Sequence, residues 1–197
     1  MKFIRELIRT IKYKSRFISK NENTKLNFVV NSSVNSKLTE LMNYHGSDKG
    51  GKNNHHNYSE YYSEIFFHKR KEVKNFLEIG LGTNNVNVAS NMGKDGVPLA
   101  SLRAWRDYFI NANIYGADID RDILKNEERI KTFYVDQTNP ETISILFKEM
   151  GVNKFDVILE DGLHEYSANI CFFENSIKYL SDNGVYIIED IYYKDKN

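Results

Sequence analysis

The chain has 197 residues, 41% of them hydrophobic, and its 27 Lys and Arg residues equal its 27 Asp and Glu residues in number. This length suffices for one sizeable core, and the balanced charge gives no general attraction to nucleic acid. A single cysteine, Cys171, excludes an internal disulfide framework and is typical of a reducing compartment. No apolar stretch reaches the roughly 18 residues of a membrane span, and the basic N-terminus lacks a signal-peptide core. We therefore expect a cytoplasmic protein with no nucleic-acid partner.

A basic amphipathic helix is predicted for residues 1–20, where apolar residues recur at helical spacing and Lys and Arg fill the other positions. Such a helix could lie on an anionic membrane surface, which would place the protein at the inner face of the membrane. Docking of the apolar stripe on the domain or on a second subunit is at least as common. Residues 21–36, rich in Asn and Ser, are typical of a linker.

Short apolar strands alternate with helices from residue 75 onward. The predicted elements are strand 75–80, helix 100–109, strands 113–120 and 130–137, helix 140–151, strand 154–161, helix 167–181 and strand 184–191. This alternation predicts a doubly wound, mostly parallel α/β sheet with helices on both faces. Ligands bind such sheets beyond the carboxyl ends of the strands.

Acids or glycines stand at the end of every predicted strand. They are Glu78, Gly80 and Gly82 after the first strand, Asp118 and Asp120 after the second, Asp136 and Gln137 after the third, Asp161 after the fourth, and Glu189 and Asp190 after the fifth. One such acid could simply cap the next helix. Five in succession at one edge indicate a binding or catalytic site.

Two kinds of cofactor suit a glycine turn after the first strand and an acid after the second. A dinucleotide requires G-x-G-x-x-G opening directly into a helix, but Asn85 stands at the third glycine position and a long loop follows. S-adenosylmethionine has no phosphate, so the glycine turn could contact its amino acid part. Asp118 could bind its ribose, and Asp136 or Gln137 its adenine. The sequence favours S-adenosylmethionine over a nicotinamide dinucleotide.

The stretch LEDGLHEY, residues 159–166, ends a strand with acids and leads to a histidine. If the fourth and fifth strands are neighbours, Asp161 lies about 5 Å from the pair Glu189 and Asp190. Crowded carboxylates repel unless one is protonated or a cation neutralises them, and an all-oxygen set suits Mg²⁺. His164 could then accept a proton near neutral pH. Alternatively, the pair caps the next segment and His164 is a surface residue.

These motifs resemble a known family over about residues 40–191. ExGxG, GADID, DGLH and IIED, with HGSDKG and HNYSEYY upstream, are similar to motifs of bacterial class I sugar O-methyltransferases, which methylate macrolide sugars and surface polysaccharides. The resemblance implies a Rossmann-like class I methyltransferase fold, S-adenosylmethionine and Mg²⁺ as cofactors, and a saccharide or glycoconjugate as acceptor.

The resemblance also implies individual roles. Asp161, Glu189 and Asp190 would hold Mg²⁺, which orients the sugar, and His164 would be the general base. Glu78 would support the glycine turn at the cofactor. The chain would comprise a helix and linker (1–36), a helical cap on the substrate side (37–74) and a cofactor-binding core (75–197). For the cap residues Tyr58, Tyr61 and Tyr62, helical spacing favours packing over stacking on the sugar.

Two features depart from the family pattern. Leu99 stands where glycine is expected before the helix at 100–109. The fold usually continues after its fifth strand with a helix and an antiparallel pair of strands, which we do not expect within these 197 residues. An exposed edge strand favours association, so we expect a homo-oligomer. The alternative to an enzyme is a non-catalytic member of the fold with a binding or scaffold role.

Overall fold

The computed structural model describes residues 36–52 and 56–191, which form helices on both faces of one sheet. The strands are β1 (Asn75–Ile79), β2 (Asn113–Asp118), β3 (Ile130–Tyr134), β4 (Phe155–Glu160) and β5 (Leu180–Ile188). Their order across the sheet is β3-β2-β1-β4-β5, and all neighbouring pairs are parallel. The predicted doubly wound parallel sheet is therefore confirmed. The order reverses between β1 and β4, where ligands of such sheets bind.

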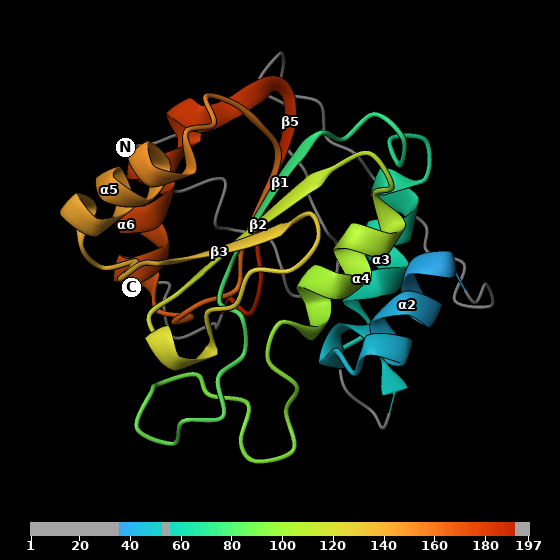
Figure 1. Ribbon diagram of the computed structural model, residues 1–197, viewed down its shortest axis with the longest axis horizontal. Coiled ribbons are helices and arrows are strands. Elements are labelled where there is room, and N and C mark those ends of the chain that lie inside the picture. The colour runs from blue at the N-terminus through green and yellow to red at the C-terminus, as the bar shows by residue number, and fades with distance from the viewer. Residues whose placement is uncertain (1–35, 53–55, 192–197) are drawn as a thin grey trace.

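Two sets of helices cover the sheet (Figure 1). The helices α2 (Lys37–His45), α3 (Tyr58–Phe66) and α4 (Ala100–Tyr108) lie on one face, and α5 (Pro140–Met150) and α6 (Tyr166–Ser176) lie on the other. Successive strand residues point to opposite faces. Phe76 accordingly packs in the core beside α2–α4, and Leu77 packs in the core beside α5 and α6. Because both faces are buried, the strands are apolar almost throughout.

Some element boundaries differ from those predicted. β2 ends at Asp118 because the Asp120 side chain accepts from the main-chain N–H of Asp122 at 3.0 Å and starts the 3-10 turn η3 (Arg121–Ile123). The last helix is shorter than expected, since a 3-10 turn, η4 (Ile177–Tyr179), follows α6. β5 begins earlier, at Leu180, because this residue pairs with β4 before a shift in register.

Aromatic side chains join the cap helices to the sheet. Trp105 of α4 is fully buried, with its ring centroid 4.8 Å from that of Phe76 on β1 and 5.5 Å from that of Tyr62 on α3. Contacts of this kind each contribute about 0.5–1.5 kcal/mol beyond the burial of area. They fix α3 against the sheet and thereby fix the position of the Tyr62 hydroxyl.

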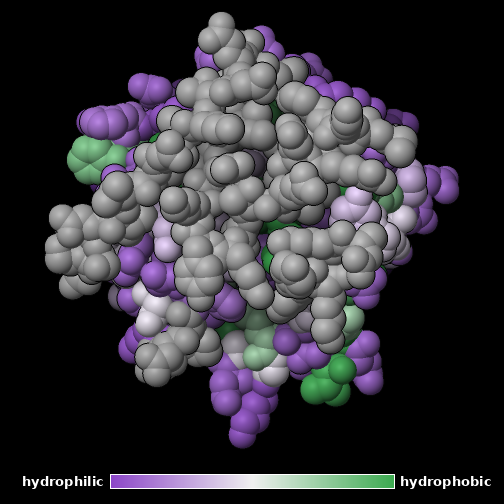
Figure 2. Space-filling view, turned by 180° about the vertical axis from the view of Figure 1, so that it is seen from behind, coloured by the Kyte–Doolittle hydropathy of each residue, from purple (hydrophilic) through white to green (hydrophobic). Residues whose placement is uncertain are grey.

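Residues 1–35 lie outside the described residues, as do residues 53–55, so the N-terminal helix, the linker and the membrane contact stay predictions. Among the described residues, no helix has the length and apolar character needed to cross a membrane. The described surface visible in Figure 2 is mainly hydrophilic, with separate hydrophobic side chains. Within the described chain β5 pairs only with β4, so the predicted association at this edge is neither confirmed nor contradicted.

Arg129 caps the carboxyl end of α4. Its guanidinium donates to the main-chain oxygens of Arg106, Phe109 and Ala112 at 2.8, 3.1 and 2.9 Å. The last carbonyls of a helix have no partner within the helix, and a cation there also complements the helix dipole. Arg129 thus ties the helix end to the segment that leads into β3.

Replacement of Arg129 by methionine should lower the free energy of unfolding by about 2 kcal/mol, because three carbonyls lose their donor while the apolar stem is kept. Urea denaturation measures the change. Arg121→Met is the matched control: Arg121 is exposed and lies 3.6 Å over the ring of Tyr134, a contact worth about 1 kcal/mol or less at an exposed site. Equal losses for the two variants would contradict the capping role.

Candidate active site

The turn after β1 depends on two glycines with positive φ. Gly80 has φ 86°, and a Cβ there would overlap the main-chain oxygen of Asp161, so only glycine lets the ends of β1 and β4 approach this closely. Gly82 has φ 76°, and a Cβ there would overlap the side chain of Met92. The ExGxG motif therefore forms a bare main-chain turn at the switch point of the sheet.

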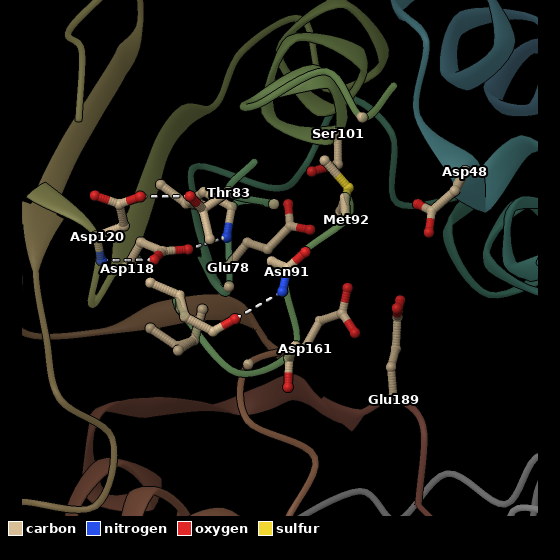
Figure 3. Close-up of a pocket in the computed structure, with 18 of the residues that line it drawn as sticks. Asp48, Glu78, Thr83, Asn91, Met92, Ser101, Asp118, Asp120, Asp161 and Glu189 are labelled. Atoms are coloured by element: carbon tan, nitrogen blue, oxygen red, sulfur yellow. Dashed lines mark hydrogen bonds between the residues drawn. The ribbon is translucent and has the colours of Figure 1, made fainter. Parts of the chain in front are cut away.

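Asp118 holds this turn in place. One of its carboxylate oxygens accepts from the main-chain N–H of Leu81 at 2.6 Å, and the other accepts from that of Asp120 at 2.8 Å. Asp120 accepts in turn from the Thr83 hydroxyl (Figure 3). Burial raises the pKa of Asp118, although these main-chain donors oppose the shift. Asp118, predicted to bind ribose, thus lines the pocket with both oxygens engaged by the protein.

The two residues after β3 have different surroundings. Gln137 is buried, its amide nitrogen donates to Glu160 at 3.0 Å, and its amide oxygen accepts from the main-chain N–H of Leu163 at 2.7 Å. Asp136 is half-buried and accepts from the main chain and the hydroxyl of Thr138 at 2.9 and 2.6 Å. Gln137 therefore braces the loop after β4, and Asp136 stands at the pocket wall.

The acids of LEDGLHEY separate to opposite sides of the sheet. Glu160 is buried on the side of α5 and α6, where it accepts from Gln137 at 3.0 Å and from the main-chain N–H of Gly162 at 3.2 Å. Asp161 points to the other side, toward Lys49 and His164. Glu160 is thus a support for the loop, and Asp161 belongs to the site.

Three acids from neighbouring strand ends surround one buried ammonium group. Lys49 Nζ donates to Asp161 and, at 2.6 Å, to Glu189, and it lies 3.8 Å from Glu78. Figure 3 shows the carboxylates of Glu78, Asp161 and Glu189 pointing into the same part of the pocket. The sequence predicted that a cation neutralises these acids, but sequence reasoning overlooked Lys49 as a source of that charge.

The HGSDKG segment delivers Lys49 to the acids. Gly46, with φ 85°, ends α2, and Ser47 caps the 3-10 turn η1 (Asp48–Gly50) by accepting from the main-chain N–H of Lys49 at 3.4 Å. Gly51 donates to the main-chain oxygen of His56 at 2.8 Å and ties the turn to the start of α3. The sequence did contain a feature that could have indicated Lys49, namely a lysine placed between turn-forming residues.

His164 and Asp190 complete the cluster. His164 Nε2 lies 3.0 Å from an oxygen of Asp161, and ligand atoms of Asp161, His164 and Asp190 lie within 4.8 Å of one another. Both His164 and Asp190 have positive φ, 61° and 50°. Such strain at non-glycine residues persists only where the surroundings enforce it, and it is frequent at functional sites. The four residues predicted for metal binding and catalysis are therefore neighbours, although their roles stay predictions.

Charge and burial set the protonation of the cluster. Burial raises the pKa of the Asp161 carboxyl, but the Lys49 ammonium and the His164 imidazole outweigh burial and hold this pKa at about 2. Burial lowers the pKa of His164, and Asp161 more than compensates, so that the pKa lies above its ordinary value. For Glu78, burial dominates and raises the pKa to about 7. Neither oxygen of Glu78 accepts a hydrogen bond within the described structure.

Two of the three cap tyrosines contact the acids. The Tyr62 hydroxyl donates to Glu189, and the Tyr58 hydroxyl donates to Asp190. Tyr62 is buried in the core beside Trp105, as the packing interpretation predicted, while its polar end reaches the site. Helical spacing could predict the packing but not the partner of each hydroxyl.

An open pocket of about 1010 Å³ lies over these residues. The loop at residues 83–99 borders it and is tied to the turn, because the main-chain N–H groups of Met92 and Leu99 donate to Thr83 and Leu81, each at 2.9 Å. Leu99 has φ 64° although its side chain is buried. The expected glycine position therefore keeps a glycine-like conformation, which burial of the leucine side chain stabilises.

Proteins of known activity share sequence with this chain. The 8-demethyl-8-alpha-L-rhamnosyl tetracenomycin-C 2'-O-methyltransferase of Streptomyces olivaceus is 30% identical over 78% of this chain and 37% of that protein. Demethylmacrocin O-methyltransferase of Streptomyces fradiae is 29% identical over 81% of this chain and 38% of that protein. The chain is related to bacterial sugar O-methyltransferases. It spans about two fifths of the length of these curated relatives, and no protein-family model matches it.

A solved sugar O-methyltransferase has the same fold. The mycinamycin-pathway methyltransferase MycE, in complex with Mg, S-adenosylhomocysteine and mycinamycin VI, superposes with a TM-score of 0.65 and 27% identity over 79% of this chain and 39% of that chain. The predicted resemblance and the class I methyltransferase fold are thus confirmed over the shared length.

The raised pKa of Glu160 can be tested through the pH dependence of stability. Burial raises the pKa of Glu160 from 4.5 to about 7 in the folded protein. The folded state therefore binds this proton more tightly than the unfolded state, and the free energy of unfolding falls as the pH rises from about 4.5 to 7. Glu160→Gln should reduce this fall and stabilise the protein at pH 8 by about 2 kcal/mol.

Urea denaturation between pH 5 and pH 8 measures the effect. In Glu160→Gln, the free energy of unfolding should still fall somewhat between these pH values, because the pKa of Glu78 is also raised to about 7. Glu64→Gln on the exposed side of α3 is the control and should leave the pH dependence unchanged. If the free energy of unfolding fell as much in Glu160→Gln as in the wild type, Glu160 would not be the titrating group.

Proposed function

We propose that the chain carries the cofactor-binding and catalytic part of an S-adenosylmethionine-dependent O-methyltransferase that acts on a sugar hydroxyl. The observation that carries the proposal is the grouping of Asp161, His164 and Asp190 beside the glycine turn, at the switch point of the sheet, in an open pocket. The named activities of the relatives, which methylate sugars of tetracenomycin and macrolide compounds, support this choice of acceptor.

The glycine turn suits the amino acid part of S-adenosylmethionine. Gly80 and Gly82 line the pocket with half-buried main chain, and Glu78 lies under the turn with two oxygens that accept no hydrogen bond and could accept from a ligand ammonium group. Helix α4 begins only at Ala100, so the turn does not open directly into a helix as a pyrophosphate site requires. Asp118 and Asp136 line the same pocket on the side of β2 and β3.

The donor set also suits Mg²⁺. Asp161 and Asp190 present carboxylate oxygens to the pocket, and Mg²⁺ is usually bound by one or two carboxylates together with water and substrate oxygens. Glu189, the third predicted ligand, is bonded to Lys49. When bound, the ion would act as a Lewis acid and as a template for a vicinal pair of sugar oxygens.

The side chains around the pocket would remove the proton of the sugar hydroxyl and keep the acids in position. Asp161 orients the imidazole of His164 through the 3.0 Å hydrogen bond. His164 would take the proton of the sugar hydroxyl, and S-adenosylmethionine, when bound, would supply its methyl group to that oxygen and leave as S-adenosylhomocysteine. Tyr58 and Tyr62 hold Asp190 and Glu189 in place through their hydroxyls.

Calorimetric titration with S-adenosylhomocysteine, with and without Mg²⁺, tests the cofactor class, and NAD is the control ligand. Micromolar binding of S-adenosylhomocysteine without binding of NAD would support the proposal. Binding of NAD alone would favour an oxidoreductase, and binding of neither by the folded protein would favour a non-catalytic role.

His164→Ala should lower the turnover number for methyl transfer to a sugar acceptor by about 10² or more, because it removes the group that takes the proton in the proposed mechanism. The affinity for S-adenosylhomocysteine should stay within a factor of about three, since the glycine turn is unchanged. His68→Ala, an exposed histidine after α3, is the matched control. An unaltered rate in His164→Ala would remove this histidine from the mechanism.

A further inference from the structure

The segment that leads into His164 is held through the main chain of Leu163. The N–H of Leu163 donates to the amide oxygen of Gln137 at 2.7 Å, and its carbonyl oxygen accepts from the Ser90 hydroxyl at 3.0 Å. Because a peptide group is planar, a bond to the carbonyl of Leu163 also orients the peptide nitrogen of His164. Gln137 follows β3 and Ser90 lies in the loop after β1, so two distant parts of the chain brace this one residue.

His164 needs this brace because its own backbone is strained. Its φ is 61°, a conformation that a non-glycine residue keeps only where the surroundings enforce it. A Cβ at Gly162 would overlap the amide oxygen of Gln137, so no side chain at that position can take over the brace. If the peptide before His164 turned toward a relaxed φ, the imidazole would leave Asp161, whose carboxylate oxygen lies 3.0 Å from Nε2.

Ser90 is itself held in an unusual conformation. Its φ is 60° although its side chain is exposed, so burial does not offset the strain as it does at Leu99. The side chain of Asn91 builds this turn (Figure 3), because its nitrogen donates to one main-chain group before it at 2.8 Å and its oxygen accepts from one after it at 3.0 Å. The turn therefore presents the Ser90 hydroxyl to the carbonyl of Leu163 at the pocket wall.

The loop at residues 83–99 thereby joins the glycine turn to the segment after β4. The main-chain N–H of Met92 donates to the carbonyl of Thr83, beside the turn, at 2.9 Å. Ser90, two residues earlier, reaches Leu163, and both Ser90 and Met92 line the pocket. One short stretch of chain therefore contacts the cofactor side and the histidine side of the pocket.

We propose that Ser90 is a positioning residue for methyl transfer. Its hydroxyl fixes the peptide between Leu163 and His164, and this holds the imidazole beside Asp161, where it can receive the proton of the acceptor. The inference rests on the proposed function, in which His164 takes that proton. One hydrogen bond of ordinary strength changes the population of a conformation about fivefold, which sets the size of the expected effect.

Ser90→Ala removes the hydroxyl at an exposed position where no packing is lost. With S-adenosylmethionine and methyl α-L-rhamnopyranoside as probes, the kcat of the full chain should fall about fivefold, while the Kd of S-adenosylhomocysteine stays within about twofold. Ser90→Gly relieves the strain but also lacks the hydroxyl, so its kcat should fall at least as far. Ser144→Ala, at an exposed position of α5, is the matched control and should leave kcat unchanged. A wild-type kcat in both Ser90 variants would overturn the inference.

A double-mutant cycle separates positioning from a general structural role. In the His164→Ala background, Ser90→Ala should lower the residual rate by less than about twofold, because the group that Ser90 positions is gone. A further loss of about fivefold in that background would show that Ser90 acts independently of His164 and would overturn the inference.

The imidazole nitrogen resonances of His164 give a readout that needs no turnover. They are assigned by their loss in His164→Ala. Ser90→Ala should shift or broaden them and leave the resonances of His68, an exposed histidine after α3, unchanged. Unchanged His164 resonances in Ser90→Ala would overturn the inference whether or not the probe sugar is methylated.

The same samples distinguish the two proposals. A wild-type protein that binds S-adenosylhomocysteine and methylates the probe, but whose kcat and His164 resonances do not respond to Ser90→Ala, would overturn the role of Ser90 alone. A protein whose His164 resonances respond, but which neither binds S-adenosylhomocysteine nor methylates the probe, would overturn the proposed function and with it the role of Ser90 in methyl transfer.

Discussion

The buried contact of the Lys49 ammonium with the carboxylates of Asp161 and Glu189 joins the parts of the site that come from distant segments. Lys49 lies on a turn between the first two described helices, whereas the acids end β4 and β5. Three carboxylates on neighbouring strand ends would repel one another without a cation. The ammonium makes this arrangement possible before any other ion binds, and it ties the cap to the sheet.

The aromatic core and the glycine turn support this contact from two sides. Trp105 packs against Phe76 and Tyr62, which sets the height of α3 above the sheet and brings the Tyr62 hydroxyl to Glu189. Gly80 lets the end of β1 lie against the end of β4. Because the strand order reverses at that point, the pocket opens between the cap and the loop at residues 83–99.

Burial gives neighbouring acids different roles. Glu160 and Asp161 are adjacent in the chain, yet Glu160 braces Gln137 and Gly162 inside the protein while Asp161 meets Lys49 and His164 at the pocket. Their pKa values move in opposite directions, because burial dominates at Glu160, whereas Lys49 and His164 together outweigh burial at Asp161. One short motif therefore supplies both a buried support for the loop and an acid that faces the pocket.

The sequence by itself determined the parallel sheet and the edge at which the acids gather, because strand and helix patterns are local and parallel strands end at the same side. Strand alternation could also have placed Glu78, Asp161 and Glu189 on one face, since each lies two residues beyond a residue of the α2–α4 core, Phe76, Leu159 and Ile187. Only the tertiary structure decided that Lys49 fills the space between these acids and that Tyr62 binds Glu189. Such contacts join residues more than a hundred positions apart, and no local pattern encodes which side chains meet.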